Sequence, residues 1–123
     1  MSEQKQKDIR RAKKEALFFK ELSKFFLQIS INDANLSGIH ISSVKLSPDK
    51  SVCTILFYSD KGHADFSNRL ANLILYKPSL RKALSQNIPS RYTPELVFKY
   101  DTQIEKQRKL EALFDKLEVE GKL

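Results

Sequence analysis

The strongest constraint on the fold of this chain is a run of apolar residues that recurs at steps of three and four positions between Ile9 and Ile29. This spacing places the residues on one face of an α-helix. Phe18 and Phe25 widen the apolar face, which predicts a helix that lies flat on a sheet. A face so rich in phenylalanine is expected to belong to the core and not to a ligand pocket. The turn-forming stretch INDANLSG, residues 31–38, is expected to end the helix.

Two β-strands are predicted to follow this helix. Residues 39–46 and 51–58 are rich in β-branched and aromatic side chains, and the four residues between them, SPDK, suit a type I turn, which predicts a hairpin. In the first strand the apolar positions change parity, which predicts a β-bulge near Ser42 and Ser43. Cys53 in the second strand is expected to be a small buried hydrophobe.

A proline at position 78 separates two helical patterns. Apolar residues recur at helical spacing before it, in residues 62–76, and again after it, up to residue 88. Proline lacks an N–H and is well accepted only in the first turn of a helix, so one continuous helix here would cost about 3 kcal/mol or more. Two helices that meet at a kink at Pro78, the second starting at Pro78 and Ser79, therefore explain the sequence better.

The rest of the chain is typical of one more strand and one more helix. Residues 91–101 alternate between apolar and polar side chains, and Pro94 near their start favours the beginning or the edge of a sheet. A polar helix with a modest apolar stripe is predicted for residues 102–117. This order of elements predicts an α+β fold with helices packed on one face of a three-stranded sheet.

The length of 123 residues predicts one domain, residues 1–123, with a core over about residues 8–101 and a C-terminal helix and tail over residues 102–123. No apolar run approaches the roughly 20 residues needed to span a bilayer, and the charged start does not resemble a secretory signal. A single cysteine excludes an internal disulfide. These features predict a cytoplasmic protein.

Positive charge is concentrated in two segments. Lys and Arg total 22 against 15 Asp and Glu, which gives a formal net charge of +7. Residues 1–14 hold six basic and two acidic side chains, and five basic residues but no acid lie between Asp65 and Glu95. From Glu105 to the end, five bases balance five acids. A basic excess confined to two segments favours a face that binds a polyanion, and a merely solvated surface is the alternative.

Catalysis has little support in the sequence. His40 and His63 have no second ligand at metal spacing, and the three glycines are isolated, which argues against a glycine-rich phosphate loop. No nucleophile motif and no paired carboxylates accompany an apolar run. We therefore expect no enzyme activity, no catalytic residue, no metal and no cofactor.

The kink suggests an anion-binding site instead. A helix that starts at Pro78 points its free N–H groups and the positive end of its dipole at an anion. The polar and basic side chains expected around that point are Lys77, Ser79, Arg81 and Lys82. The alternative is that Ser79 only caps the helix and that the cations are solvated.

Several short motifs resemble those of a known family. The strongest is the last strand, RYTPELVFKYD, with its arginine, its proline-glutamate-leucine, its phenylalanine and its aspartate. The other motifs fall in the hairpin turn, at the start of the helix after the kink and at the end of the first helix: Ser47-Pro48-Asp49, Leu80-Arg81 with Leu84, and Asp33-Ala34-Asn35-Leu36. Over roughly residues 8–110, the chain is similar to the ribosome-binding factor A family of bacteria.

The resemblance implies a KH-like domain of type II, in which a kinked helix–helix replaces the RNA-binding glycine loop of ordinary KH modules. The chain departs from the family pattern at Tyr76-Lys77-Pro78, where the family carries alanine-x-glycine. Glycine permits a close approach of the backbone and proline does not, so the kink is expected to persist with a different detailed geometry. Thr102 and Gln103 stand where the family has a serine.

The resemblance also implies a function in ribosome biogenesis. Such proteins bind the immature 30S small ribosomal subunit and its 16S rRNA without covalent chemistry. They assist late maturation and processing of the 16S rRNA 5′ end, often with importance in the cold. The expected partners are the 30S subunit and 16S rRNA, with no membrane, no small-molecule substrate and a monomeric state. A basic protein–protein adaptor is the main alternative, and an RNA-processing enzyme is a third.

Phosphate contacts are expected from basic residues of both positively charged segments. The first choices are Lys77, Arg81, Lys82 and Arg91, and the second are Arg10, Arg11, Lys13, Lys14 and Arg69. Binding that neutralises phosphates in this way would weaken as salt is raised and would depend little on the nucleotide sequence.

Overall fold

The computed structural model describes residues 2–89 and 92–121, and it shows an α+β fold. In chain order its elements are α1 (Glu3–Asn32), the short 3-10 helix η1 (Ala34–Leu36), β1 (Ile39–Leu46), β2 (Val52–Ser59), α2 (His63–Ile74), α3 (Lys77–Asn87), β3 (Glu95–Tyr100) and α4 (Thr102–Val119). The fold class and the order of elements predicted from the sequence are confirmed.

The strand β2 is the centre of the sheet. β1 pairs with β2 in antiparallel orientation and β3 pairs with it in parallel orientation, so β1 and β3 form the two edges. The register between β1 and β2 shifts between Ile41 and Ser43, which confirms the predicted bulge. β3 begins directly after Pro94 and lies at an edge, where a missing N–H is tolerated.

The side chain of Asp49 holds the hairpin turn. Its carboxylate accepts hydrogen bonds from the Ser47 hydroxyl at 2.7 Å, the Ser51 hydroxyl at 2.8 Å and the Ser51 amide at 3.1 Å. These hydrogen bonds, of which the one from Ser47 has the largest effect, lower the pKa of Asp49 to about 2. The Lys50 amide donates to the Ser47 carbonyl at 2.9 Å, with Lys50 in a left-handed conformation (φ 62°). The turn is therefore stabilised by its own residues.

Alternation along β2 divides the sheet into a covered face and an open face. Cys53, Ile55 and Phe57 have 0% of their surface exposed and belong to the core formed with α1, α2 and α3. The Phe57 ring contacts Phe26 of α1 and Phe66 of α2, with ring centroids 5.6 Å and 5.8 Å away. The β2 residues between the buried ones are only half-buried. The helices thus pack on one face of the sheet, as predicted.

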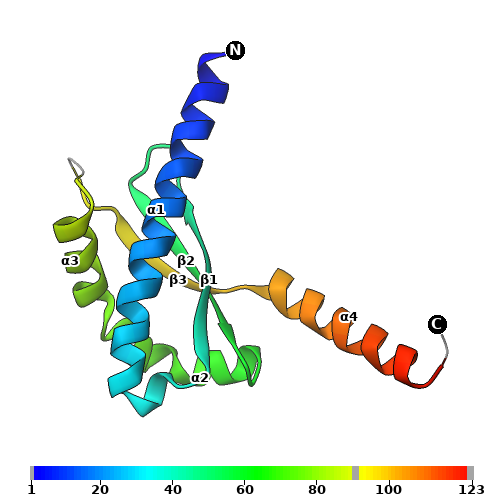
Figure 1. Ribbon diagram of the computed structural model, residues 1–123. Helices are drawn as coiled ribbons and strands as arrows, with labels where there is room; N and C mark the ends of the chain where they lie inside the picture. Colours follow the sequence, from blue (N-terminus) through cyan, green and yellow to red (C-terminus); the bar gives the residue numbers. More distant parts are fainter. Residues whose placement is uncertain (1, 90–91, 122–123) are drawn as a thin grey trace.

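The first helix is longer than the periodicity predicted. It begins at Glu3 instead of residue 9, because the Ser2 hydroxyl caps it by accepting a hydrogen bond from the Lys5 amide at 3.2 Å. It ends at Asn32, within the INDANLSG stretch. Figure 1 shows the first turns of α1 extending beyond the sheet, where residues 2–10 are all exposed.

The break between α2 and α3 falls at Leu75 and Tyr76 and not at the proline itself. Pro78 is the second residue of α3, so this helix starts one residue earlier than expected and Ser79 is not its cap. Tyr76 occupies the N-cap position, and its hydroxyl donates to the carboxylate of Asp33 at the end of α1. This hydrogen bond is the main cause that lowers the pKa of Asp33. The break is therefore tied to the end of α1.

The helix α4 leaves the sheet after β3 and projects away from the domain (Figure 1). None of its residues is buried. Asp101 caps it, because one carboxylate oxygen accepts hydrogen bonds from the amides of Gln103 and Ile104, both at 3.1 Å. The other oxygen accepts a hydrogen bond from the hydroxyl of Ser42 at 2.7 Å. The β1 bulge therefore anchors the start of the C-terminal helix.

Replacing Tyr76 with phenylalanine is expected to lower the melting temperature at neutral pH, because the hydrogen bond to Asp33 is lost while the ring remains. Folding lowers the pKa of Asp33 from its ordinary value of 3.8. The ionised carboxylate therefore stabilises the folded state above pH 3.8, and this stabilisation is lost as the pH falls through the lowered pKa. Melting curves of the variant and the parent should converge in acid. A difference in melting temperature that does not change with pH would contradict this role of Asp33.

The thiol of Cys53 is expected to resist modification in the native protein. Its side chain is fully buried, and burial, followed by the charge of Glu15, raises the pKa of the thiol from 9.0 to about 12. Such a pKa leaves about a thousandfold less thiolate at neutral pH. Labelling with a disulfide reagent should be fast in denaturant and very slow without it. Equal labelling rates with and without denaturant would show that β2, which carries Cys53, opens readily in the native protein.

Candidate nucleic-acid interface

A groove of about 500 Å³ runs between α3 and the segment that leads into β3. Its lining residues are Pro78, Arg81, Lys82, Ser85, Tyr92 and Thr93. Arg81 and Lys82 give the groove two positive charges from α3. The Tyr92 side chain, from the opposite wall, is 72% exposed and offers an aromatic surface.

A second groove, of about 540 Å³, continues from the first because both share Tyr92 and Thr93. It adds Lys14 from α1 and Lys50 from the β1–β2 turn. The full lining is Lys14, Asp49, Lys50, Ser51, Pro89, Tyr92, Thr93 and Pro94. Cations from three separate elements therefore border one depression, and we call these two connected grooves the basic groove.

Arg81 has a structural contact in addition to its charge. Its Nε donates to the Pro94 carbonyl at 3.2 Å and its Nη2 donates to the Thr93 carbonyl at 3.1 Å. These bonds hold the segment before β3 against α3 and so shape the wall of the basic groove. Carbonyl oxygens carry no net charge, so the guanidinium keeps its full positive charge for an anion.

Lys77 and Ser79 lie at the start of α3, at one end of the basic groove. Lys77 borders a neighbouring hollow together with Ile74, Pro78, Arg81, Glu95 and Leu96, and its Nζ lies 5.2 Å from the centre of the Phe98 ring. Ser79 is exposed in the first turn. The N-cap residue Tyr76 provides no side-chain hydrogen bond to the helix end. Pro78 in the first turn of α3 has no N–H to offer an anion, and anion binding at this helix end stays a prediction.

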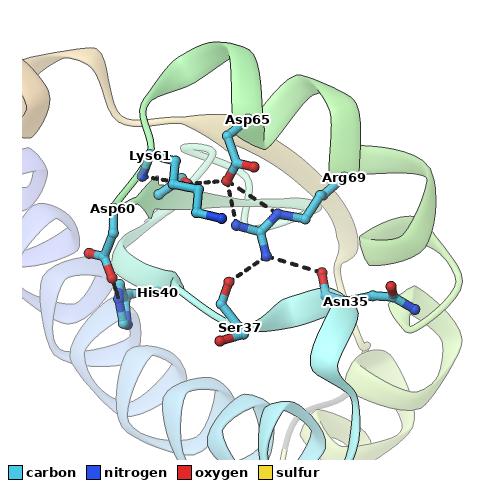
Figure 2. Close-up of polar contacts among 8 residues, drawn as sticks. Asn35, Ser37, His40, Asp60, Lys61, Asp65 and Arg69 are labelled. Carbon is cyan, nitrogen blue, oxygen red and sulfur yellow. Dashed lines mark hydrogen bonds and ion pairs between the residues drawn. The ribbon is translucent and has the colours of Figure 1, made fainter.

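Arg69 is bound internally instead of facing the basic groove. Figure 2 shows its guanidinium between the carboxylate of Asp65, one turn earlier on α2, and the carbonyl oxygens of Asn35 and Ser37. The hydrogen bond from Arg69 is the main cause that lowers the pKa of Asp65, and that from Ser59 comes next. The arginine joins α2 to the loop before β1, and Asp65 neutralises its charge.

The basic residues of α1 are spread around the helix. Lys14 lines the basic groove, whereas Arg11 forms an ion pair with Asp8 at 3.4 Å. Arg10 and Lys13 are exposed. The remaining predicted contact, Arg91, lies outside the described residues.

Of the groove residues that sequence reasoning missed, Lys50 and Tyr92 are the ones that bring a positive charge and an exposed aromatic ring. Lys50 belongs to the hairpin turn and Tyr92 precedes the last strand, so only the folded chain brings them together. Within residues 2–89 and 92–121, no cluster of three His, Cys, Asp or Glu side chains could hold a metal ion. No helix in these residues is long and apolar enough to cross a membrane.

Comparisons of the sequence and of the structure with known proteins all point to one family. The family model described as ribosome-binding factor A matches residues 10–114. The protein of that name from Nitrosococcus oceani is 35% identical over 104 residues, which cover 81% of this chain and 78% of that protein. That from Thermosipho melanesiensis is 38% identical over 91 residues, covering 73% and 72%. The crystal structure of ribosome-binding factor A from Thermus thermophilus superposes with a TM-score of 0.61 at 24% identity, over 72% of this chain and 92% of that one.

Replacing Arg81 with alanine is expected to lower the free energy of unfolding by about 1–3 kcal/mol, because two hydrogen bonds to backbone carbonyls are lost. Replacing its neighbour Lys82, which is exposed, should change it by less than about 0.5 kcal/mol. Urea denaturation of both variants measures the difference. Equal changes in the free energy of unfolding for the two variants would show that Arg81 has no structural role.

Proposed function

The chain belongs to the ribosome-binding factor A family, and we propose that it binds the immature 30S subunit through 16S rRNA and assists late maturation of that rRNA. Family membership makes it a ribosome-associated factor and gives no indication of an enzyme. Binding to the 30S particle, processing of the 16S rRNA 5′ end and a cytoplasmic location are the finer parts of the proposal.

The observation that carries the proposal is the basic groove. Lys14, Lys50, Arg81 and Lys82 come from three elements and border one depression. Cations in this arrangement neutralise phosphates and release their condensed counterions, which favours binding to RNA of any sequence. The exposed ring of Tyr92 adds a surface on which a base can stack. Among the described residues that line the groove, Asp49 is the one acid, and its carboxylate already accepts hydrogen bonds from Ser47 and Ser51.

The contacts with RNA would come from side chains more than from the backbone. Pro78 has no N–H and occupies the first turn of α3, so the backbone there cannot approach phosphates as a glycine loop does. Lys77 and Lys82, together with Arg81, would supply the charge on either side of the proline. A rigid break fixed by the Tyr76–Asp33 hydrogen bond keeps these cations in one arrangement.

The mechanism requires no covalent step. A rigid basic domain that fits one arrangement of the immature rRNA better than another shifts the population toward that arrangement. The favoured arrangement would be the one in which separate processing enzymes reach the 5′ end. In this mechanism the protein itself needs neither a cofactor nor a small-molecule substrate.

Sedimentation of a cell extract tests the proposal against the adaptor alternative. We expect the protein to travel with free small subunits at low salt and to leave that fraction when salt is raised. Nuclease treatment should release it. Association with one protein that survives nuclease would support an adaptor and overturn the proposal, as would recovery only in ribosome-free fractions at low salt.

The double variant Lys50→Glu and Lys82→Glu is expected to bind a 16S rRNA fragment at least about tenfold more weakly. Loss of two phosphate contacts should also flatten the slope of log affinity against log salt by about 1.4–1.8. Both side chains are exposed, so melting should stay nearly unchanged. Filter binding at several salt concentrations gives both values.

The matched control is Lys20→Glu with Lys24→Glu, two exposed positions on α1 outside the basic groove that carry the same change in charge. The control should weaken binding much less. If the two double variants lose affinity equally, net charge and not the groove determines binding. A collapse of the melting transition in Lys50→Glu and Lys82→Glu would show that these residues are structural.

A further inference from the structure

The outer side of β1 is an unpaired edge of the sheet. β1 pairs with β2 on its other side, and no described strand pairs with the side that faces away from β2. The Asp60 amide donates to the Gly38 carbonyl at 3.0 Å, which makes these opposite residues a hydrogen-bonded pair of the antiparallel ladder. Such pairs alternate along a ladder, so Ile39 and Ile41 direct their N–H and C=O groups away from β2.

Two features protect the second half of this edge. The Leu46 amide also points outward, and it donates to the carboxylate of Glu15 on α1 at 2.6 Å. The bulge between Ile41 and Ser43 interrupts the ladder before that point. Charged side chains and bulges are common devices that keep a strand edge from pairing. The segment from Ile39 to Ile41 lies before both of them and keeps a regular ladder edge.

An apolar pocket of about 380 Å³ lies between this segment and α1. Leu27 and Ile31 of α1 line it and are 61% and 74% exposed, so two large aliphatic side chains stand in solvent beside the edge. Burying them against a partner is favourable. The other apolar side chains of the lining are Phe26, Leu36, Ile39 and Ile41.

The lining of this pocket does not favour a polyanion. His40 is its one titratable side chain among the described residues, and the ring Nε2 lies 3.3 Å from the carboxylate of Asp60 (Figure 2). The hydroxyl oxygen of Ser23, which also lines the pocket, is buried and has no hydrogen-bond partner in the described part of the chain. Buried hydroxyls normally have a partner, so this atom is a further group that an occupant can satisfy.

We propose that this edge and pocket bind an extended segment of another protein, which adds to the sheet as a strand beside β1. The backbone of the segment pairs with the outward N–H and C=O groups of Ile39 and Ile41. An extended chain is the occupant that fits, because a helix uses its own backbone groups internally and leaves those of the edge unpaired.

The geometry of strand pairing also determines which side chains the segment carries. Residues directly opposite each other in a sheet have their side chains on the same face. Ile39 and Ile41 turn toward the core on the face that α1 covers. The two residues that pair with them therefore point toward α1, where the pocket receives them. The segment is expected to carry apolar residues two positions apart, with no requirement for charge.

Selection from random peptides of about ten residues, the upper length of an ordinary strand, tests this expectation. The peptides are displayed on phage and selected on the immobilised full-length chain. Enriched peptides should share apolar residues at alternate positions. A selection that enriches no peptide, or that enriches acidic peptides held by the basic groove, would overturn the proposal.

The backbone of a selected peptide distinguishes strand addition from simple apolar contact. N-methylation of its alternating apolar residues removes the N–H groups that face β1 and should weaken binding about tenfold or more. N-methylation of the residues between them should have little effect. In the complex, deuterium exchange of the Ile39 and Ile41 amides should slow, whereas that of Leu46, already bonded to Glu15, should not change. Equal losses from both methylation patterns would overturn the proposal.

The double variant Leu27→Glu and Ile31→Glu tests the pocket. It should weaken binding of the selected peptide about tenfold or more, because two charges replace apolar surface. Both side chains are exposed, so melting should stay nearly unchanged. The matched control is Leu75→Glu with Val119→Glu, the same change at residues that are 75% and 87% exposed outside the pocket. If the control weakens binding equally, the pocket is not the site.

Peptide binding and rRNA binding can fail separately. The pocket shares no lining residue with the basic groove. The variant Leu27→Glu with Ile31→Glu should therefore keep the parental affinity for the 16S rRNA fragment, and Lys50→Glu with Lys82→Glu should keep that for the peptide. A loss of rRNA affinity in the pocket variant as large as that in the groove variant would assign the pocket to the RNA interface and overturn the proposal.

Discussion

The packing around Phe57 is the interaction on which the rest of the structure depends. This fully buried ring on the central strand contacts Phe26 of α1, Phe66 of α2 and Phe98 of β3, with centroids 5.1–5.8 Å away. Removing a buried phenylalanine ring typically costs about 3–5 kcal/mol, a large share of the stability of a small domain. One side chain therefore fixes two helices and an edge strand against the centre of the sheet.

This packing also determines where the basic groove lies. The parallel pairing of β3 with β2 brings the segment before β3 alongside α3, where Arg81 bonds to the carbonyls of Thr93 and Pro94. The same segment lies next to the hairpin turn, because the Glu95 amide donates to the Ser51 carbonyl at 2.9 Å. Cations that are far apart in the sequence therefore border one depression as a result of how the core is packed.

Much of the fold could be predicted because it depends on local patterns. The stripe of α1, the bulge near Ser42, the hairpin turn and the break near Pro78 each follow from residues within one or two turns of the chain. The parallel pairing of β3 with β2 involves distant residues and leaves no comparable local signal. The early start of α1 depends on a cap by Ser2, which lies outside the apolar periodicity.

The candidate site could be predicted only in part, for the same reason. Lys77, Arg81 and Lys82 share one helix with the proline, so the sequence places them together. Lys50 and Tyr92 join them only after folding. Arg69 could have been recognised as internal, because Asp65 precedes it by four residues on the same helix, the spacing of an ion pair.

The distribution of charge differs between the basic groove and α4. The net charge of +7 lies outside α4, whose four bases and four acids cancel, and the cations of the basic groove favour a polyanion. Residues 110–121 at the end of α4 hold four acids and one base, so this part of the chain would repel the same polyanion. The hydrogen bond from the Ser42 hydroxyl to Asp101, the residue that caps α4, anchors the start of this helix at the β1 bulge. A bulge in the edge strand thus holds a helix of zero net charge apart from the cations of the groove.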